Sequence, residues 1–465
     1  MTYHEAIAYL ESFVDYEKLM GYVYDPVRFN LARPRRLLAA LGDPQQRFDA
    51  IHIAGTKGKG SAAIMTDAML RAAGYRSGLF TQPHLVSFRE RIVTDGELIP
   101  EQDLAALVER VQPAIEEHTE HPEEGRLTFF EIYTALALLY FAERGVDLAV
   151  MECGLGGRLD ATNVLAPVVC AITPIGIEHT AELGDTLAAI AGEKAGIIKP
   201  HTPLVMAPQE PEAEEMILRT ATDREAEVYR VIVAAAAASG GGAVMPGQLT
   251  TICAVPGRVR NGGQTFTLKC HSPHERDLQL DDLYLPVIGR HQVANAAVAV
   301  GIIAVLGQHR QPKREGVDWP TAIREGLSQV ELPGRLQICE RNPFLIVDGA
   351  HTRESGAASR AAIDEFIPHD KLVLVLGCLR GKNVRAVAEQ LTGAADEVIL
   401  TAPDSPRALP VEEMRQQVRD LWPAAHRAPD APAALALARK LARPQDAIVV
   451  TGSIYLAGEV LALLQ

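Results

Sequence analysis

Short apolar runs alternate with longer amphipathic stretches along the first half of the chain. Runs with the length and composition of buried strands lie at residues 50–54, 148–151 and 168–172. Stretches that repeat apolar residues at helical spacing lie at residues 3–20, 34–41, 62–73, 102–117 and 129–144. Short buried strands that alternate with helices predict a parallel sheet covered by helices on both faces.

The same alternation begins again near residue 331. The strand candidates of this second unit lie at residues 344–347, 372–376, 397–400 and 447–451, and its amphipathic helices include 411–421 and 431–442. The stretch at 225–285 is more β-rich, and its low-complexity run at 234–242 predicts a surface loop. Two α/β units joined by a short linker favour a ligand site between them.

Composition limits the class of protein. The chain has 465 residues, of which 48% are apolar and 22% charged, as is typical of a soluble protein with two or three domains. A formal net charge of −14 argues against binding nucleic acid through a basic surface. The six cysteines form no C-x-x-C pair, which predicts reduced thiols. Neither a signal peptide nor a membrane span is recognisable, so we expect a cytoplasmic protein without a membrane partner.

The strongest local motif is IHIAGTKGKGS at residues 51–61, an apolar run followed by a Gly-rich turn and a helical pattern. Free N–H groups at a helix N-terminus, together with the helix dipole, attract a phosphate. Lys59 can reach phosphate oxygens, and the Ser61 hydroxyl can face Mg²⁺. The spacing departs from G-x-x-x-x-G-K-[ST], because Gly60 separates Lys59 from Ser61. The motif predicts nucleotide binding; the alternative is a Gly-rich βα turn with a solvated lysine.

Other polar groups follow predicted strands, at the sheet edge where parallel sheets bind ligands. Glu152 is suited to hold a Mg²⁺ that also touches phosphates, although a solvated carboxylate is the alternative. His179 and Lys194 come after the third predicted strand, and each of them alone is more typical of a solvated side chain. In the second unit, Arg335 offers a fork suited to phosphate, and Asp348 is either a ligand-facing group or an Asx-type turn residue.

An ordered set of motifs covers nearly the whole chain. These motifs are GTKGKGS (55–61), TQPHL (81–85), RERI (89–92), TFFE (128–131), ECGLGGRLDATN (152–163), HTAELGDTLAAIAGEKAGIIK (179–199), GRHQVANA (289–296), PGR (333–335), DGAH (348–351) and VTGSIYLAGEV (450–460). Through them the chain resembles the folylpolyglutamate synthase and dihydrofolate synthase family of the Mur ligase superfamily.

The resemblance implies a Mur-ligase-like α/β fold. A P-loop parallel-sheet domain at residues 1–328 is expected to bind ATP and the pteroate or folate, and a linker at 329–336 leads to a smaller Rossmann-like domain at 337–465 that completes the nucleotide and glutamate site. The implied activity is ATP-dependent amide formation, in which a carboxylate of dihydropteroate or of a folylpolyglutamate is phosphorylated and L-glutamate attacks the acyl phosphate. The implied partners are therefore small molecules, and a monomer is expected.

The resemblance also implies roles for individual residues. The residues expected to contact ATP are Gly55, Thr56, Lys57, Gly58, Lys59, Gly60, Ser61, Asn295, Arg335, Asp348 and His351. The expected ligands of two Mg²⁺ ions are Gln82, Glu152, His179 and Lys194, the last carboxylated on its side-chain nitrogen. The expected pteroate pocket consists of Thr128, Phe129, Phe130, Glu131, Leu159, Asp160 and Ala161, with Phe129 or Phe130 stacked on the ring. Lys59, His179 and Lys194 are the expected catalytic residues, and a monovalent cation is a further expected ligand.

Several positions depart from the family pattern. Family members usually carry Asn where Lys57 stands, Ser where Gln82 stands and Asp where Glu178 stands. Thr352 follows the DGAH motif where Asn is usual, and an expected acidic residue is missing around residues 381–383. These departures leave the ATP and Mg²⁺ positions in place, whereas the substrate preference is open to change.

Two alternatives to a folate ligase stay open. One is a nucleotide-binding scaffold that has lost turnover, although Glu152, His179 and Lys194 together favour an enzyme. The other is a different Mur-type amide ligase. The TFFE segment and the Leu-Asp-Ala segment at 159–161 argue against it, because in the family they belong to pteroate recognition rather than to ATP use.

Overall fold

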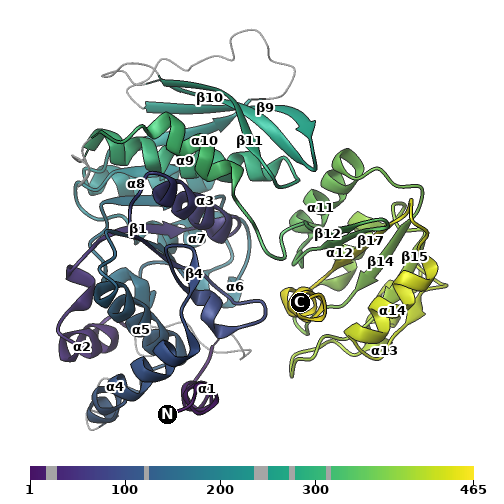
Figure 1. Ribbon diagram of the computed structural model, residues 1–465, viewed down its shortest axis with the longest axis horizontal. Helices are drawn as coiled ribbons and strands as arrows, with labels where there is room; N and C mark the ends of the chain where they lie inside the picture. The colour runs from purple at the N-terminus through teal and green to yellow at the C-terminus, as the bar shows by residue number, and fades with distance from the viewer. Residues whose placement is uncertain (17–28, 120–124, 235–249, 272–277, 310–315) are drawn as a thin grey trace.

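The computed structural model describes residues 1–16, 29–119, 125–234, 250–271, 278–309 and 316–465. These residues form two α/β domains, each built around its own sheet (Figure 1). The chain passes from the first domain to the second between α10 (Trp319–Ser328) and β12 (Gln337–Arg341). The predicted two-domain α/β fold is confirmed.

The first sheet is parallel at its centre and antiparallel at both edges. Its strands are β1 (Asp49–Ala54), β2 (Ser77–Phe80), β3 (Ile92–Thr94), β4 (Glu97–Leu98), β5 (Leu148–Glu152), β6 (Val169–Ile172), β7 (Leu204–Met206), β8 (Val228–Val233), β9 (Thr250–Arg260), β10 (Gly263–His271) and β11 (Leu278–Leu285). Within the described residues their order is β11-β10-β9-β8-β7-β6-β1-β5-β2-β3-β4. The neighbours from β9 to β2 in this order are all parallel. The pairs β2–β3 and β3–β4 at one edge, and β9–β10 and β10–β11 at the other, are antiparallel.

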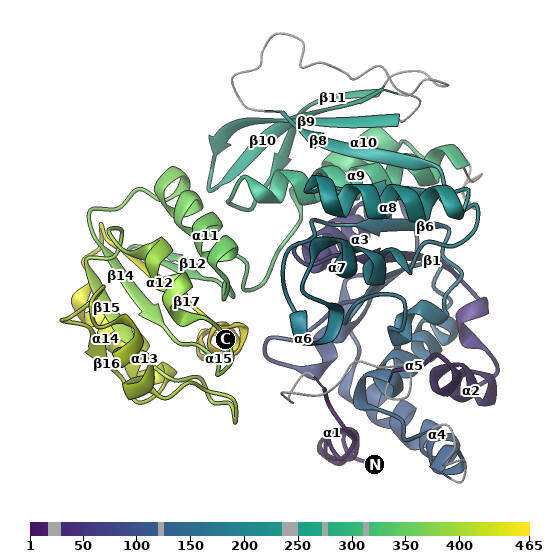
Figure 2. The same cartoon turned by 180° about the vertical axis from the view of Figure 1, so that it is seen from behind.

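Helices cover both faces of this sheet, as predicted. The helices of the domain are α1 (Tyr3–Glu11), α2 (Ala32–Ala40), α3 (Lys59–Ala72), α4 (Glu101–Thr119), α5 (Phe129–Glu143), α6 (Thr180–Leu183), α7 (Leu187–Ala195), α8 (Pro211–Asp223), α9 (His291–His309) and α10, with 3₁₀ turns at Pro44–Gln46, Phe88–Arg91 and Ala161–Val164. One face of the sheet carries α3, α9 and α10. The opposite face carries α2, α4 and α5 at one end of the sheet and α7 and α8 at its other end. Helices α7 and α8 lie next to each other in Figure 2.

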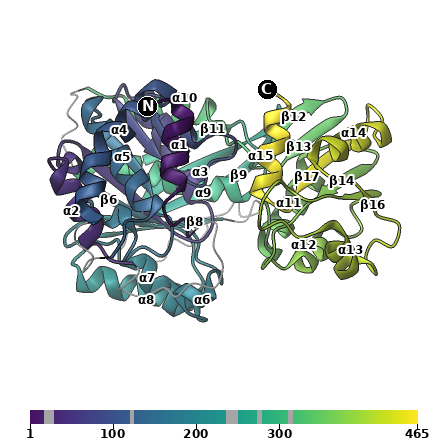
Figure 3. The ribbon, with the colours of Figure 1, turned by 90° about the horizontal axis from the view of Figure 1, so that it is seen from below.

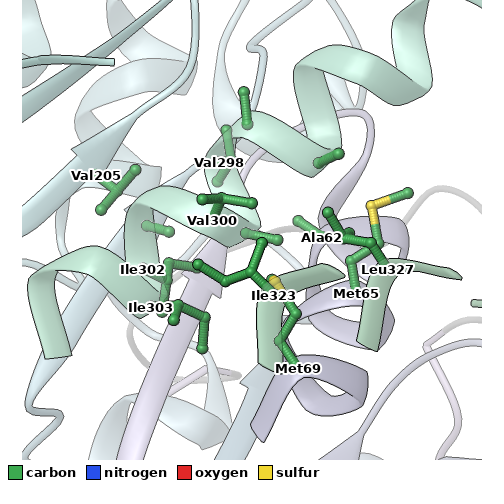
Figure 4. Packing of buried hydrophobic residues seen from close by; sticks show 14 of the residues in the cluster. Ala62, Met65, Met69, Val205, Val298, Val300, Ile302, Ile303, Ile323 and Leu327 are labelled. Atoms are coloured by element: carbon green, nitrogen blue, oxygen red, sulfur yellow. The ribbon is translucent and has the colours of Figure 1, made fainter. Parts of the chain in front are cut away.

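Alternating strand residues explain the two-sided core. In β5, Leu148 and Val150 face the α3–α9–α10 side, whereas Ala149 and Met151 face the α5 side. Figure 4 shows the first of these clusters, in which side chains of α3, α9 and α10 interdigitate above the sheet. A sheet buried on both faces needs nearly continuous apolar strands, and the central strands β5, β6 and β7 have them.

The second domain repeats the design on a smaller scale. Its strands β12, β13 (Phe344–Val347), β14 (Leu372–Leu376), β15 (Glu397–Leu400), β16 (His426–Arg427) and β17 (Ala447–Thr451) lie in the order β12-β13-β17-β14-β15-β16. All neighbours are parallel except β12 and β13. The sheet lies between α11 (Arg353–Phe366), α12 (Val384–Leu391) and α13 (Val411–Val418) on one face and α14 (Ala431–Leu441) and α15 (Ile454–Leu463) on the other (Figure 3).

The structure corrects two details of the sequence prediction. The helix expected at residues 3–20 ends at Glu11, and Val14 forms a bridge with Thr128 instead; residues 17–20 lie outside the described part of the chain. The parallel sheet expected for the first domain has antiparallel edges, where the two-residue turns Asp95–Gly96 and Asn261–Gly262 reverse the chain between β3 and β4 and between β9 and β10. The loop expected at 234–242 falls on undescribed residues except for Ala234.

One helix has the composition of a membrane span. Among the described residues only α9 is long and apolar enough to cross a membrane, and 72% of its most apolar window is buried inside the protein. It packs against α3 and several strands of the first sheet, so its apolar surface belongs to the core.

Candidate active site

Four neighbouring parallel strands end at one edge of the first sheet. The phosphate-loop candidate at 55–61 follows β1, Gln82 follows β2, Glu152 ends β5, and the segment 173–179 follows β6. These segments line one large cavity of about 920 Å³, which is closed on its other side by residues of the second domain. The cavity therefore lies at the sheet edge and between the domains, where a ligand site was predicted.

The turn at 55–61 is shaped by contacts that leave no room for side chains. A Cβ at Gly55 would lie 1.9 Å from Oγ1 of Thr173, and a Cβ at Gly58 would lie 2.2 Å from Oδ1 of Asn295. Gly58 has φ +85 and precedes α3, whose first turn has no side-chain cap. Backbone N–H groups at this helix start, together with Lys59, are arranged to receive an anion in the cavity.

The first half of the same turn is bound to the segment after β6. The N–H groups of Thr56 and Lys57 both donate to the carbonyl oxygen of Pro174 (3.0 and 3.2 Å). The Thr56 hydroxyl donates to the Gly176 carbonyl oxygen (3.3 Å), and the Lys57 ammonium donates to the Glu178 carboxylate (2.9 Å). The backbone amides of Thr56 and Lys57 are thus engaged, whereas their side chains line the cavity.

Glu152 is a buried carboxylate beside the helix start. Glu152 is 3% exposed. Nζ of Lys59 lies 3.8 Å from Oε1 of Glu152, and the backbone N–H of Gln82 donates to Oε2 of Glu152 (3.0 Å). A Cβ at Gly60 would lie 3.2 Å from Oε2, which shows how closely α3 approaches. Burial raises the pKa of Glu152, and the positive charge of Lys59 acts in the opposite direction. The side-chain amide of Gln82 donates to the Glu152 carbonyl oxygen (3.4 Å).

His179 and Lys194 come from two further elements, α6 and α7. His179 has φ +54, precedes α6 and lines the cavity. Lys194 is 5% exposed, and its ammonium donates to the Gly55 carbonyl oxygen (2.9 Å). Burial, followed by the charge of Lys59, lowers the pKa of Lys194 to about 7. Lys194 thus contacts the 55–61 turn directly, whereas His179 shares with the turn the cavity that both line.

These side chains do not form a ready-made metal cluster. Within the ranges that the structure describes, no group of three or more His, Cys, Asp or Glu side chains is arranged to hold a metal ion. Glu152 and His179 line the cavity, while Lys194 reaches the turn from beneath, through Gly55. Their joint role as ligands stays a prediction.

The TFFE segment serves both the fold and the cavity. Thr128 and Glu131 form a capping box at the start of α5, and Glu131 also accepts bonds from Nε of Arg33 (3.0 and 3.2 Å). Phe130 lines the cavity, but Phe129 is 1% exposed and lies in the core. Cζ of Arg91 lies 5.4 Å from the centroid of the Phe129 ring. Phe129 is therefore ruled out as a ring that a ligand in this cavity can contact, because adjacent helical residues point about 100° apart.

The segment at 159–161 borders the cavity next to Phe130. Leu159, Asp160 and Ala161 all line it. The Asp160 carboxylate accepts the N–H groups of Gly154 and Leu155 (both 2.9 Å) and is 5% exposed. Asp160 therefore orders the Gly-rich turn that follows Glu152, in addition to any contact with a ligand.

The second domain contributes the remaining predicted residues. Arg335, Asp348 and His351 line the cavity opposite Asn295 of α9. Asp348 accepts the Leu336 N–H (3.2 Å), so its carboxylate also orders the turn that leads into β12. Asn295 donates to Gln292 (2.9 Å).

Sequence reasoning missed several residues of the cavity wall. These residues include Asp15, Glu182, His291, Lys382, Arg407 and Tyr455. His291 and Tyr455 lie inside the motifs GRHQVANA and VTGSIYLAGEV, which was the available signal, whereas Asp15 and Arg407 belong to no motif. Two departures from the family pattern meet here, because Lys57 and Glu178 bond to each other, and Lys382, from the segment that lacks the expected acid, also contacts Glu178.

Comparison with protein families gives two matches. Residues 53–303 match the Mur ligase middle domain, and residues 334–454 match the Mur ligase glutamate ligase domain. The first match alone covers more than half of the chain.

Similar proteins cover the chain almost completely. It is 34% identical to folylpolyglutamate synthase of Lacticaseibacillus casei over 99% of this chain and 98% of that protein. It is 33% identical to dihydrofolate synthase/folylpolyglutamate synthase of Bacillus subtilis over 85% and 87%. A probable bifunctional folylpolyglutamate synthase/dihydropteroate synthase of Haloferax volcanii is 35% identical, but the chain, matched over 96% of its own length, spans only about 50% of that protein.

A solved structure has the same fold. Mycobacterium tuberculosis folylpolyglutamate synthase complexed with ADP superposes with a TM-score of 0.85 at 31% sequence identity, covering 99% of this chain and 98% of that one. At this identity and coverage the likeness extends to both domains.

Proposed function

Because the chain belongs to the folylpolyglutamate synthase and dihydrofolate synthase family of the Mur ligase superfamily, we propose that it is an ATP-dependent ligase. It joins L-glutamate in amide linkage to dihydropteroate, to folylpolyglutamates or to both. The observation that supports this most directly is the cavity where the start of α3, Lys59 and the buried Glu152 meet residues of the second domain. We place the domains at 1–328 and 337–465, with 329–336 as the linker.

The proposed chemistry needs activation of a carboxylate. A carboxylate resists attack by an amine because it is negatively charged and because oxide is a poor leaving group. Transfer of the γ-phosphoryl group of ATP gives an acyl phosphate, from which phosphate leaves when the glutamate amine forms the C–N bond. In this proposal the N–H groups at the start of α3 and the Lys59 ammonium stabilise the charge on the moving phosphoryl group. Asn295, Arg335, Asp348 and His351 hold the rest of the nucleotide.

The residues around Glu152 suit a divalent cation. Glu152 is a nearly inaccessible carboxylate whose pKa is raised by burial, and its nearest positive group, Lys59, lies 3.8 Å away. Carboxylate and amide oxygens together with imidazole are suitable ligands, so we propose that Glu152, His179, Gln82 and a carboxylated Lys194 hold Mg²⁺ at two positions, with room for a monovalent cation nearby. Bound Mg²⁺ supplies positive charge that offsets the charge of the phosphates.

The environment of Lys194 supports carboxylation. A lysine takes up CO₂ only through its neutral amine, when the nitrogen lone pair attacks the carbon and a proton leaves. With a pKa of about 7, a substantial fraction of Lys194 is neutral near neutral pH, unlike an exposed lysine. The product is an anion at a position next to the 55–61 turn, where a cation needs a ligand.

The pteroate pocket is proposed on the Phe130 side of the cavity. Thr128, Phe130, Glu131, Leu159, Asp160 and Ala161 line it together. The partly buried ring of Phe130 is the one available in the cavity to stack on a pterin or aminobenzoyl ring. In this proposal the protein is a monomer that acts on ATP, L-glutamate and a folate in the cytoplasm, without nucleic acid or membrane.

Phosphate release by the purified protein tests the proposal. We expect release with ATP, Mg²⁺ and L-glutamate only when dihydropteroate or tetrahydrofolate, each tested separately, is added, and we expect EDTA to abolish it. Stimulation by neither acceptor would remove the folate reading. ATP binding without any phosphate release would identify a catalytically silent protein of the same fold.

Lys194→Ala tests the carboxylated lysine. We expect the variant to fold normally and lose turnover, with no rescue by added bicarbonate, because the nitrogen that forms the carbamate is gone. Lys440→Ala, which removes an exposed lysine in the last turn of α14, is the control and should keep full activity. Full activity of Lys194→Ala would disprove the carbamate.

A further inference from the structure

Glu178 is bonded to both domains at once. Its Oε2 accepts a bond from the Lys57 ammonium in the phosphate loop (2.9 Å). Its Oε1 faces the second domain, with Lys382 Nζ at 3.5 Å and His351 Nε2 at 3.6 Å. The two carboxylate oxygens are therefore divided between the domains, and all four side chains line the same cavity.

On the first-domain side, Glu178 is attached to a stiff unit. The segment 173–179 is joined to the phosphate loop by the two N–H bonds to the Pro174 carbonyl oxygen and by the Thr56 hydroxyl bond to Gly176. The absence of space for a Cβ at Gly55 shows that the two segments are also in direct contact. A shift of Glu178 is therefore transmitted to the phosphate loop.

On the second-domain side, both partners are held by their own domain. The His351 backbone N–H donates to the Ser355 hydroxyl (3.1 Å), and its Nδ1 lies 2.9 Å from the Gly349 carbonyl oxygen. Lys382 precedes Asn383, whose side chain caps α12 by accepting the Ala386 N–H (3.0 Å). The positions of His351 and Lys382 thus follow the position of the whole second domain.

The ion pair between Arg290 and Glu365 also joins the two domains, but it lies away from the phosphate loop. Arg290, which precedes α9, bonds to Glu365 of α11, and its guanidinium lies over Phe366. Glu365 does not line the cavity. Glu178 is also better shielded, with a side chain that is 16% exposed against 38% for Glu365. Ion pairs that water reaches less are screened less by solvent and salt.

We propose that Glu178 is a positioning residue, which sets the phosphate loop and the second domain relative to each other across the cavity. Closure of the second domain and the orientation of the Lys57 segment then both depend on this side chain. The test of this proposal by kcat rests on the ligase function proposed above, whereas its test by the arrangement of the domains does not.

Glu178→Gln, which keeps the shape and removes the charge, tests this proposal, with Glu365→Gln as the matched interdomain control. We expect Glu178→Gln to lower kcat about tenfold with little change in the KM for ATP, since a misplacement of about 1 Å caused by a substitution away from the chemistry can cost about 100-fold. In small-angle X-ray scattering with a non-hydrolysable ATP analogue, Glu178→Gln should have a larger radius of gyration than the unsubstituted protein. Glu365→Gln should leave kcat within about twofold of the unsubstituted protein.

Two further variants separate positioning from general damage. Glu178→Asp keeps the charge on a shorter side chain and should recover part of the lost kcat. Adding Lys382→Gln to Glu178→Gln should lower kcat by less than about twofold more, because both changes break the same contact. Melting curves check that every variant is folded.

Three results would overturn the proposal. They are a Glu178→Gln kcat within twofold of the unsubstituted protein, a loss no larger than that of Glu365→Gln, and a loss of kcat with unchanged scattering. If the unsubstituted protein shows no ligase activity, the proposed function fails, but the scattering comparison still decides whether Glu178 holds the domains together.

Discussion

Single residues set the shape of the phosphate loop, and Gly58 is the clearest case. Its φ of +85 lies in the left-handed region that suits glycine, and the amide oxygen of Asn295 occupies the space where a Cβ would be. The same contact brings Asn295 of α9 onto the loop, so one glycine links the phosphate end of the site to a residue expected to hold the nucleotide.

Gly58→Ala should destabilise the protein more than backbone strain alone explains. The control is Gly393→Ala, because Gly393 has a similar φ of +83 but nothing within 4 Å of its Cβ position. We expect the control to lower the free energy of unfolding by about 1–2 kcal/mol through strain, and Gly58→Ala to lower it by at least about 1 kcal/mol more. Urea unfolding measures both, and equal losses would show that Asn295 yields without penalty.

The buried lysine predicts a pH dependence of stability. The pKa of Lys194 is about 7 in the folded protein and 10.5 when unperturbed, so between these values the unfolded chain binds a proton that the folded chain does not. The contribution of Lys194 to the free energy of unfolding therefore rises with pH between these values. Below pH 7 Lys194 is protonated in the folded protein as well, and its buried charge destabilises the fold.

Lys194→Met removes this dependence. Between pH 7 and 9, in CO₂-free and Mg²⁺-free buffer, the stability of the unsubstituted protein should increase relative to that of the variant. Chemical unfolding at several pH values measures the difference. A difference that does not change with pH would show that Lys194 has an ordinary pKa in the folded protein.

At this scale the sequence predicts which residues meet but not how each side chain is used. Lys59, Glu152 and Lys194 follow strands or belong to motifs, and the parallel sheet brings them to the same turn. The four-letter motif at 128–131 could not distinguish Phe130 from Phe129, because the choice depends on how α5 is rotated against the core. The sequence also could not show that the Asp160 carboxylate accepts hydrogen bonds from backbone N–H groups.

Among the elements, α5 shows how a motif combines folding with function. Its capping box joins Thr128 to Glu131, and Arg33 of α2 bonds to the same carboxylate with both residues nearly inaccessible. The start of α5 is therefore fixed against α2, and Phe130 is presented to the cavity from a rigid position.

Glu131→Ala should destabilise the fold strongly. It removes a helix cap and takes a negative charge away from the buried Arg33 guanidinium, for which we expect a loss of about 3 kcal/mol. The control is Glu5→Ala, which breaks the same kind of capping box at the exposed start of α1 and should have a much smaller effect. Comparable losses in thermal unfolding would mean that the Arg33 contact contributes little.

The strand and helix alternation was predictable, but the sheet edges were not predicted although the sequence marks them. Asp95–Gly96 and Asn261–Gly262 are typical two-residue hairpin turns, and each joins two antiparallel strands. The strands β3 and β4 are too short to show a period of two, so the turn residues were the usable signal. The end of α1 at Glu11 was missed because apolar spacing continues beyond it while Val14 pairs with Thr128.

In the whole molecule, contacts across the domains decide the geometry of the site, and these are the contacts that sequence cannot give. Glu178 and Lys382 are 204 residues apart, and nothing in either segment indicates the other. A second contact of this kind involves Leu85, which lies three residues after Gln82 and packs its side chain against the core of the second domain. Because Gln82 bonds to Glu152, this segment connects the proposed metal site with the second domain.

Gly458 is the position where this connection is most sensitive. A Cβ on Gly458 of α15 would lie 2.1 Å from the Leu85 carbonyl oxygen, so Gly458→Ala must move the segment at 81–85 or the second domain. The substitution suits the helix itself, since alanine favours helix more than glycine does. Gly356→Ala is the matched control, because in α11 its Cβ would meet only ordinary contacts at 3.5 Å.

We therefore expect Gly458→Ala to remain folded and to bind an ATP analogue about tenfold more weakly, a loss of about 1.4 kcal/mol, because the cavity needs both domains in register. Gly356→Ala should bind the analogue as the unsubstituted protein does. Titration calorimetry measures both affinities. If Gly458→Ala binds normally, the second domain can shift without disturbing the nucleotide site, and the Leu85 contact then serves only to pack the two domains together.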